Sequence, residues 1–342
     1  MSETAVQNDL AAGVSAKRSR SAALRSLREL SLVPAIVIAI IIGSFVSDVF
    51  LSKDNILNIL QQSSELSVLV LAQSMILIVG KFDLSLESTV GLAPMTAAWL
   101  MATETAFGGS GLGVNVYVCI AVVFAVGLLV GIVNGFLVVR MRLNAFIVTL
   151  AMLILLRGTT LGITNGKTLF DLPEEFLYLG TARWFGAPVS IWVAGILFIV
   201  FGLLLRYHKW GRALYAIGGN ADAARVAGIR VDRVTWSVYI IGSILAALAG
   251  LMLTGRIASV VSSHGQNMIF YVFAAAVIGG ISLNGGRGRL VGALTGVLLL
   301  GFLQNVLTLA EVAAFWIDAV YGAIILVALI LSRITGGTKQ DD

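Results

Sequence analysis

The amino-acid sequence predicts an all-α polytopic membrane protein with about ten transmembrane helices and both termini in the cytosol. Of its 342 residues, 58% are hydrophobic and only 12% are charged, whereas about 25% of a soluble globular protein is charged. Its Lys and Arg residues lie in short loops between apolar runs, as in membrane proteins that follow the positive-inside rule. The net charge of +5 therefore does not indicate nucleic-acid binding.

Ten segments approach the roughly 20 apolar residues that a spanning helix needs. They are residues 31–50, 65–80, 86–102, 115–139, 145–164, 188–206, 234–254, 268–283, 290–309 and 313–332. The second, third and eighth are short or interrupted by glycine. Between the second and third, GKFDLSLES predicts either a cytosolic turn or a broken helix buried in protein.

The basic residues support this number of spans. With the N-terminus inside, eighteen Lys and Arg residues fall on the cytosolic side and four outside, while Arg157 lies within the fifth span. The cytosolic residues are Lys17, Arg18, Arg20, Arg25, Arg28, Lys81, Arg140, Arg142, Arg206, Lys209, Arg212, Arg225, Arg230, Arg233, Arg287, Arg289, Arg333 and Lys339, and the outer ones are Lys53, Lys167, Arg183 and Arg256. Missing one span would invert every later loop and destroy the asymmetry.

The spans define the domain organisation. We expect a flexible basic cytosolic tail at 1–30, a transmembrane domain at 31–333 and a second cytosolic tail at 334–342. A cytosolic loop at about 207–233 and an outer loop at about 165–187 are the longest connections, and the outer loop could form a short helix on the membrane. Any energy-supplying or soluble ligand-binding domain would then come from another chain.

Motifs for bond chemistry are not apparent. GITNGKT, at 162–168, has one residue too few between its glycines for a phosphate loop and follows a membrane span rather than a strand. His208 and His264 fall on opposite sides of the membrane, so they cannot share a metal. The single cysteine, Cys119, excludes an intramolecular disulfide. We therefore expect no catalytic residues, no bound metal and no cofactor in this chain.

Ionisable residues in or beside the spans are costly in a bilayer and need an explanation. Glu65, Glu311 and Asp318 are predicted near helix ends, within reach of water. Asp83 either caps a helix or lies on a transport path. Arg157 either pairs with an acid or bonds helix carbonyls, in a structural role or in a polar cavity.

Gly127, Gly131 and Gly135 form two overlapping G-x-x-x-G units in the fourth span. Such units let a second helix approach closely. The partner helix belongs either to the same subunit or to another one.

The most polar long internal stretch, GRALYAIGGNADAARVAGIRVDRV at 211–234, predicts a helix of about two turns. Asn220 is a suitable N-cap, Asp222 lies in the first turn, and Gly228 can end the helix in a left-handed conformation. So short a helix is marginal alone. Its small exposed residues favour docking in a groove of another protein, with packing on its own cytosolic face as the alternative.

This stretch resembles the cytosolic loop of the ribose-type sugar permeases of ABC transporters, which reads G-R-x-x-Y-A-x-G-G-N-x-x-A-A-x-x-x-G-I. GKFDLSLESTVGL, LNAFIVTLAMLILLRGTTLGITNG and AAAVIGGISLNGGRGRLVGALTGVLLLGFLQNVLTL resemble further segments of that family in the same order. Together they cover most of the chain from about 60 to 330.

The resemblance implies a type II ABC importer-like permease in a bacterial inner (cytoplasmic) membrane, with a homodimer enclosing the pathway. It implies two partners, a cytosolic ABC ATPase that uses ATP and Mg and a periplasmic or lipid-anchored sugar-binding protein. The implied cargo is a monosaccharide or related polyol. The implied ATPase-coupling residues are Gly218, Gly219, Asn220, Ala223, Ala224, Gly228 and Ile229. Asp83, Ser85, Asn144 and Arg157 are expected on the translocation pathway or in structural polar roles.

The chain departs from the family around Asp83. Lys81 and Phe82 replace Gly-Ile of the Gly-Gly-Ile that usually precedes Asp-Leu-Ser, and Glu87 replaces a glycine. Lys81 and Glu87 could pair with each other, or Lys81 with Asp83. Three alternatives to a sugar permease remain: a related ABC permease for nucleosides or branched-chain amino acids, an ion-coupled secondary carrier, and a receptor or scaffold. A carrier would be expected to place more acids deep in the membrane.

Overall fold

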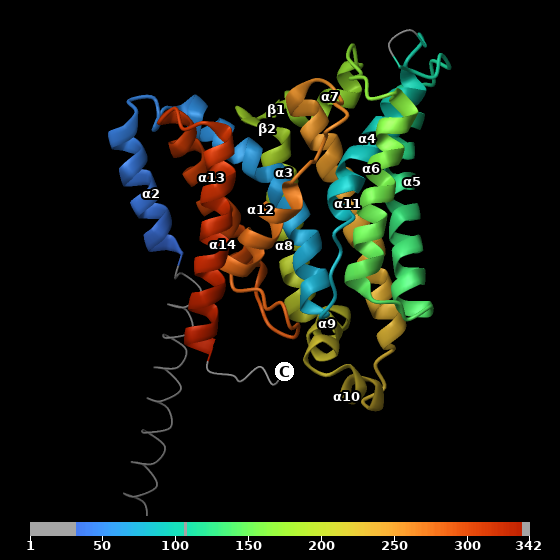
Figure 1. The fold of residues 1–342 in the computed structure, drawn as a ribbon, viewed down its shortest axis with the longest axis vertical. Helices are drawn as coiled ribbons and strands as arrows, with labels where there is room; N and C mark the ends of the chain where they lie inside the picture. The colour runs from blue at the N-terminus through green and yellow to red at the C-terminus, as the bar shows by residue number, and fades with distance from the viewer. Residues whose placement is uncertain (1–31, 106–107, 337–342) are drawn as a thin grey trace, which may run out of the picture.

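The computed structural model describes residues 32–105 and 108–336, and these residues form a bundle of helices (Figure 1). A helix lies over each of the ten predicted spans. The helices are α2 (Val33–Val46), α3 (Lys53–Ile78), α4 (Leu86–Met101), α5 (Val116–Gly135) continued by the π-helix η1 (Phe136–Arg140), α6 (Ala145–Thr164), α7 (Glu174–Thr181), α8 (Val189–Tyr207), α9 (Lys209–Gly219), α10 (Ala221–Val226), α11 (Val231–Ile257), α12 (Met268–Ile278), α13 (Leu290–Leu309) and α14 (Ala314–Gly336).

Within the described part of the chain, five helices are long and apolar enough to cross a membrane by length and composition. They are α5 with η1, α6, α8, α11 and α13. Their number, length and composition indicate a multi-pass membrane protein. The predicted outer helix at 165–187 is α7, and β1 (Arg183–Trp184) pairs antiparallel with β2 (Ala187–Pro188) beside it.

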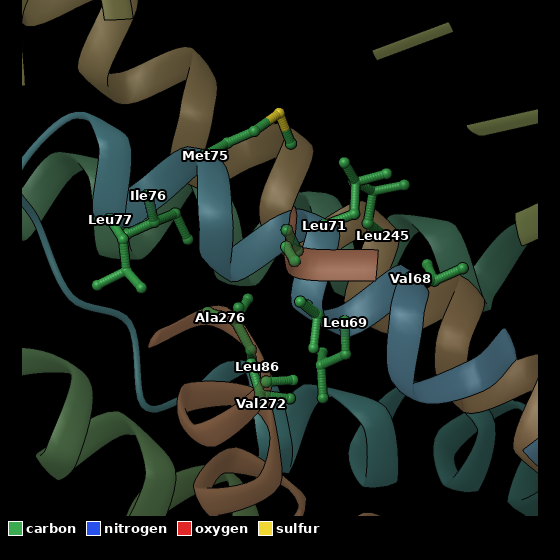
Figure 2. Close-up of a cluster of buried hydrophobic side chains, with 14 of the residues drawn as sticks. Val68, Leu69, Leu71, Met75, Ile76, Leu77, Leu86, Leu245, Val272 and Ala276 are labelled. Carbon is green, nitrogen blue, oxygen red and sulfur yellow. The ribbon is translucent and has the colours of Figure 1, made fainter. Parts of the chain in front are cut away.

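Helix α3 forms the centre of the bundle. Its N-cap Ser52 accepts a hydrogen bond from the Asn55 N–H, and nearly every residue from 63 to 78 is buried. It packs against α11, α13, α8 and α12. Figure 2 shows how Val68, Leu71 and Met75 of α3 contribute to one apolar cluster with side chains of α4, α11 and α12.

Small residues allow α5 to lie close to α11. A β-carbon on Gly131 would lie 2.6 Å from Ile240 Cα, and one on Gly127 would lie 2.8 Å from Ser243 O. Gly135 leaves room for the Trp236 ring. The G-x-x-x-G units therefore serve helix packing within one subunit, which was the first of the two interpretations.

The segment from 79 to 85 is a broken helix buried in protein, not a cytosolic turn. After α3 ends, the chain turns at Gly80, whose φ is +76°. It then runs back into the bundle as extended chain, visible between α3 and α4 in Figure 1. Asp83 and Ser85 on this segment are fully buried. Non-helical backbone is tolerated at membrane depth only where protein or a polar cavity surrounds it.

Four glycine backbones, those of Gly80, Gly218, Gly285 and Gly286, meet at the C-terminal end of α3. The Gly286 N–H donates to Ile78 O over 2.8 Å. A β-carbon on Gly218 would lie too close to the same carbonyl oxygen, and one on Gly285 would lie 2.8 Å from Gly80 Cα. This contact joins α3, the end of α9 and the loop between α12 and α13, and only glycine permits such close approach.

Two predicted spans had wrong boundaries. Helix α3 starts at Lys53 rather than 65, because its polar residues Gln61 to Glu65 are helical and largely buried instead of forming a loop. The expectation that Glu65 lies near a helix end is therefore wrong. Helix α12 ends at Ile278, where the glycine-rich turn begins, rather than at 283.

The predicted chain ends lie mostly outside the described residues. This holds for the tail at 1–30 and for 337–342, whereas residues 334–336 belong to α14. Glu311 is exposed in the turn between α13 and α14, as expected, and the side chain of Asp318 lies outside the described part.

Replacing Gly131 by leucine should destabilise the fold by about 1–3 kcal/mol or more, because the new side chain would meet the backbone of α11. The measurement is the thermal unfolding midpoint of the purified protein in detergent. Gly195→Leu is the matched control, since nothing in the described structure lies within 4 Å of a β-carbon there. Equal midpoints for the two variants would contradict the close α5–α11 packing.

Candidate functional site

Helix α10 lies at the end of the bundle opposite α7 (Figure 1). Capping residues define both of its ends. The Asn220 side chain accepts a hydrogen bond from the Ala223 N–H over 2.9 Å, and Gly228 has a φ of +84°. Arg225 lies 3.3 Å from Asp222 and 3.7 Å from Asp232, tying α10 to the start of α11. Local sequence therefore fixes this short helix, as predicted.

The two sides of α10 differ. Val226 is 91% exposed, and Ala223 and Ala227 are exposed beside it. Ala224 is 4% exposed because it packs towards the bundle, and Ile229 is half-buried. A small apolar surface therefore faces away from this chain, which we call the α10 surface: Ala223, Val226 and Ala227.

The residues implied for ATPase coupling fall into three groups. Gly219 and Ala223 are exposed, Asn220 and Gly228 shape the ends of α10, and Gly218, Ala224 and Ile229 pack inward. The inward-facing residues therefore support the helix and do not belong to its outer surface.

Helix α9 holds α10 against the bundle. The Trp210 indole N–H donates to Ser237 Oγ over 2.8 Å, and the Tyr215 hydroxyl donates to Gly288 O over 3.0 Å. Burial raises the pKa of the Tyr215 phenol, which keeps the hydroxyl protonated as a donor. The α10 surface is thus attached to the α12–α13 loop and to α11.

Asp83 lies in a buried hydrogen-bond cluster, in which Asn134 Oδ1 has no partner among the described residues. Its Oδ1 accepts from the Ser85 N–H over 2.9 Å and from Ser85 Oγ over 2.6 Å. Asn134 of α5 donates from Nδ2 to Ser85 Oγ over 2.7 Å and to Asp83 Oδ2 over 3.3 Å. These three side chains are fully buried. The cluster fixes the extended segment against α5.

Glu87 connects three elements. It forms an ion pair with Arg157 of α6, and its Oε2 accepts from the Ile269 N–H in the first turn of α12 over 3.2 Å. The Glu87 side chain is 4% exposed. Arg157 therefore pairs with an acid, as one alternative predicted, while the suggested pairing of Glu87 with Lys81 is wrong. The negative carboxylate suits the positive end of α12.

Asn144 has a local role. Its side chain is exposed, and it accepts from the Ile147 N–H over 3.2 Å at the start of α6. The four predicted pathway or structural polar residues thus do not form one site. Asp83 and Ser85 lie together, whereas Arg157 and Asn144 have separate partners.

A cavity of about 240 Å³ with both polar and apolar walls lies elsewhere, and the sequence did not identify it. Residues of α3, α11, α12, α13 and α14 line it together with the loop before α12. We call it the α3–α12 cavity and define it by its polar lining residues: Gln62, Ser63, Glu65, Arg256, Ser263, His264, Gln266, Tyr271, Gln304 and Tyr321.

An ion pair and a histidine form part of the cavity wall. Arg256 Nε donates to Glu65 Oε1 over 2.8 Å, and the Glu65 side chain is 2% exposed. His264 is 4% exposed, with Nε2 at 3.2 Å from Thr254 Oγ1. The run QQSSE at 61–65 was the available signal, because five consecutive polar residues within a helix predict a polar interior.

Comparison with known proteins shows the family. The model of a family described as "Branched-chain amino acid transport system / permease component" matches residues 55–329. This chain belongs to that permease family. It is 35% identical over 311 residues to the ribose import permease protein RbsC of Escherichia coli K12, covering 90% of this chain and 94% of that one.

Two arabinose permeases are also similar. The L-arabinose transport system permease protein AraH of Escherichia coli K12 is 35% identical over 264 residues, covering 76% of this chain and 77% of that one. The L-arabinose ABC transporter permease protein AraH of Azospirillum brasilense is 30% identical over 323 residues, covering 94% and 92%. No solved structure matches the chain.

Arg157→Ala should destabilise this permease by about 3–5 kcal/mol, because it leaves the buried Glu87 carboxylate without its cation. The measurement is the amount of folded protein and its unfolding midpoint in detergent. Adding Glu87→Gln to Arg157→Ala should recover part of the loss, because the neutral amide can still accept from Ile269 N–H. The control is Arg183→Ala at an exposed position. Wild-type stability of Arg157→Ala would show that the pair is not shielded from water.

Proposed function

We propose that the chain is the permease subunit of an ABC importer for a monosaccharide or related polyol. The relatives named for ribose and arabinose support the cargo class. The observation that carries the coupling assignment is the α10 surface, a capped helix with an exposed apolar face on the chain's most polar loop. Such a face favours docking in a groove of a cytosolic ATPase.

We infer ten transmembrane helices with both termini in the cytosol of a bacterial inner membrane. The helix over each predicted span and the excess of Lys and Arg on one side support this topology. The domains would be the tails at 1–30 and 334–342 and the permease domain at 31–333, with the coupling loop at about 207–233.

The coupling mechanism follows from the contacts of α9 and α10. Closure of the ATPase around ATP and Mg would displace α10. Helix α9 would follow, because α10 contacts α9 and its Ala224 packs towards the bundle. The close contact of Gly218 with Ile78 O and Gly286 would carry that displacement to α3 and to the α12–α13 loop. Tilting of these elements would open the pathway to one side and then to the other. This chain itself would break no covalent bond and bind no cofactor.

Three further protein contacts belong to this proposal. Two copies of the chain would form a homodimer with the pathway between them, a cytosolic ABC ATPase would contact each α10 surface, and a periplasmic or lipid-anchored binding protein would deliver the sugar. Asp83, Ser85 and Asn144 have structural roles in this proposal, because their side chains bond to neighbouring protein groups and none of the three lines the cavity.

A branched-chain amino acid is the second candidate cargo, since the matching family carries that description. The test is uptake into proteoliposomes that contain the permease, its ATPase and its binding protein, supplied with labelled ribose, arabinose, a nucleoside or leucine. Uptake of a sugar that requires ATP supports the proposal. ATP-dependent uptake of leucine or the nucleoside, without uptake of a sugar, would show that the cargo is not a sugar. Uptake driven by an ion gradient without ATP would overturn the ABC assignment.

Val226→Glu should abolish co-purification of the ATPase and reduce ATP-driven uptake at least about tenfold, because it places a charge in the centre of an apolar contact. The readouts are ATPase stoichiometry and initial uptake rate. Leu112→Glu is the control, the same change at a residue that is 65% exposed on an outer loop. Normal ATPase binding by the Val226 variant, at wild-type protein yield, would refute docking at the α10 surface.

A further inference from the structure

The α3–α12 cavity is built as a binding site with a buried floor and an accessible rim. Ser63, Glu65 and His264 at its floor are each at most 4% exposed. Ser263 and Gln266 at its rim are exposed, and both belong to the loop that connects α11 to α12.

Two buried polar atoms in the lining have no partner among the described residues. They are Ser63 Oγ and His264 Nδ1. An unsatisfied buried donor or acceptor costs about 1–3 kcal/mol. Other described buried atoms also lack a partner, Asn134 Oδ1 beside Asp83 among them. Ser63 and His264 differ in that they line a cavity, so a molecule that enters it can form hydrogen bonds with them.

The charges of the cavity are already matched. Glu65 and Arg256 pair with each other, so a ligand with a net charge would leave an unpaired charge in a buried site. Arg256 uses Nε for this bond, and its side chain is 29% exposed. A guanidinium has further N–H donors. The pair therefore offers donors and acceptors to a neutral ligand rich in hydroxyl groups.

An aromatic wall completes the site. Tyr271 of α12 and Tyr321 of α14 meet edge to face with ring centroids 4.6 Å apart, and both line the cavity. Ring faces suit the C–H surface of a sugar, while Gln62 and Gln304 add amide groups that both donate and accept.

We propose that the α3–α12 cavity of each single subunit binds one neutral monosaccharide-sized polyol. The choice of polyol rests on the proposed function, whereas the site itself rests on the unpartnered atoms, the matched ion pair and the volume. When the site is filled, Ser63 Oγ and His264 Nδ1 form hydrogen bonds with hydroxyl groups of the ligand.

The test uses Ser63→Ala and its neighbour Ser64→Ala. Ser64 is equally buried but donates to Gln61 O over 2.6 Å and does not line the cavity. Binding of labelled ribose and arabinose is measured on the permease in lipid nanodiscs without the ATPase or the binding protein, together with the unfolding midpoint of each variant.

Wild-type permease should bind one of the two sugars saturably, with one site per chain. Ser63→Ala should weaken binding about twofold to tenfold, the loss of one hydrogen bond, with an unchanged midpoint because its hydroxyl has no protein partner. Gln304→Leu should weaken binding similarly, whereas Ser64→Ala should bind normally.

The inference is overturned if the wild-type permease binds neither sugar, if both serine variants bind as wild type does, or if Ser63→Ala lowers the midpoint as much as Ser64→Ala does. These results are distinguishable from failure of the proposed function. If the chain is an importer without this site, sugar uptake would require ATP, but the isolated permease would bind no sugar. A sugar-binding permease that is not an ABC subunit would bind sugar but require no ATP.

Discussion

The fold depends on satisfying polar groups within a membrane-embedded protein. The carboxylate of Glu87 shows this most directly, because it takes an ion pair from α6 and a backbone N–H from the first turn of α12. In hydrocarbon each of these groups would be costly if left alone. Together they hold the starts of α4 and α12 inside the bundle. Both helices are accordingly short, and irregular chain leads into each of them.

The same constraint explains how the α9–α10 end of the bundle is linked to the interior. Irregular backbone at Gly80 and Gly286 lies against Gly218 of α9, with the hydrogen bond from Gly286 N–H to Ile78 O closing the contact. Side chains are absent here, so no flexible layer separates α9 from the end of α3. A displacement of α9 therefore reaches the central helix directly, which is the property that a coupling element requires.

Access to a cavity distinguishes two sets of buried polar groups in this protein. Asp83, Ser85 and Asn134 form hydrogen bonds with one another in a fully buried position that does not line the cavity, and Asn134 Oδ1 has no partner there. Ser63 and His264, although equally buried, retain atoms without partners beside a cavity. The family-based expectation for Asp83 as a pathway residue therefore has less physical support than the α3–α12 cavity, which contains none of the expected residues.

The sequence by itself predicted a helix at each of ten apolar segments, and it predicted the form of α10. Hydropathy and the distribution of Lys and Arg are properties of continuous segments, and caps such as Asn220 and Gly228 act within one helical turn. The boundary of α3 was missed because a buried polar run such as 61–65 looks like a loop when only hydropathy is considered.

Only the tertiary structure decided which distant polar residues meet. Glu87 and Arg157 are 70 positions apart in the chain, and Glu65 and Arg256 are 191 apart. No local periodicity relates such residues, because their contact depends on how α3, α4, α6 and α11 pack. The same holds for the inward side of α10 at Ala224 and for the α3–α12 cavity, whose walls come from five helices and one loop.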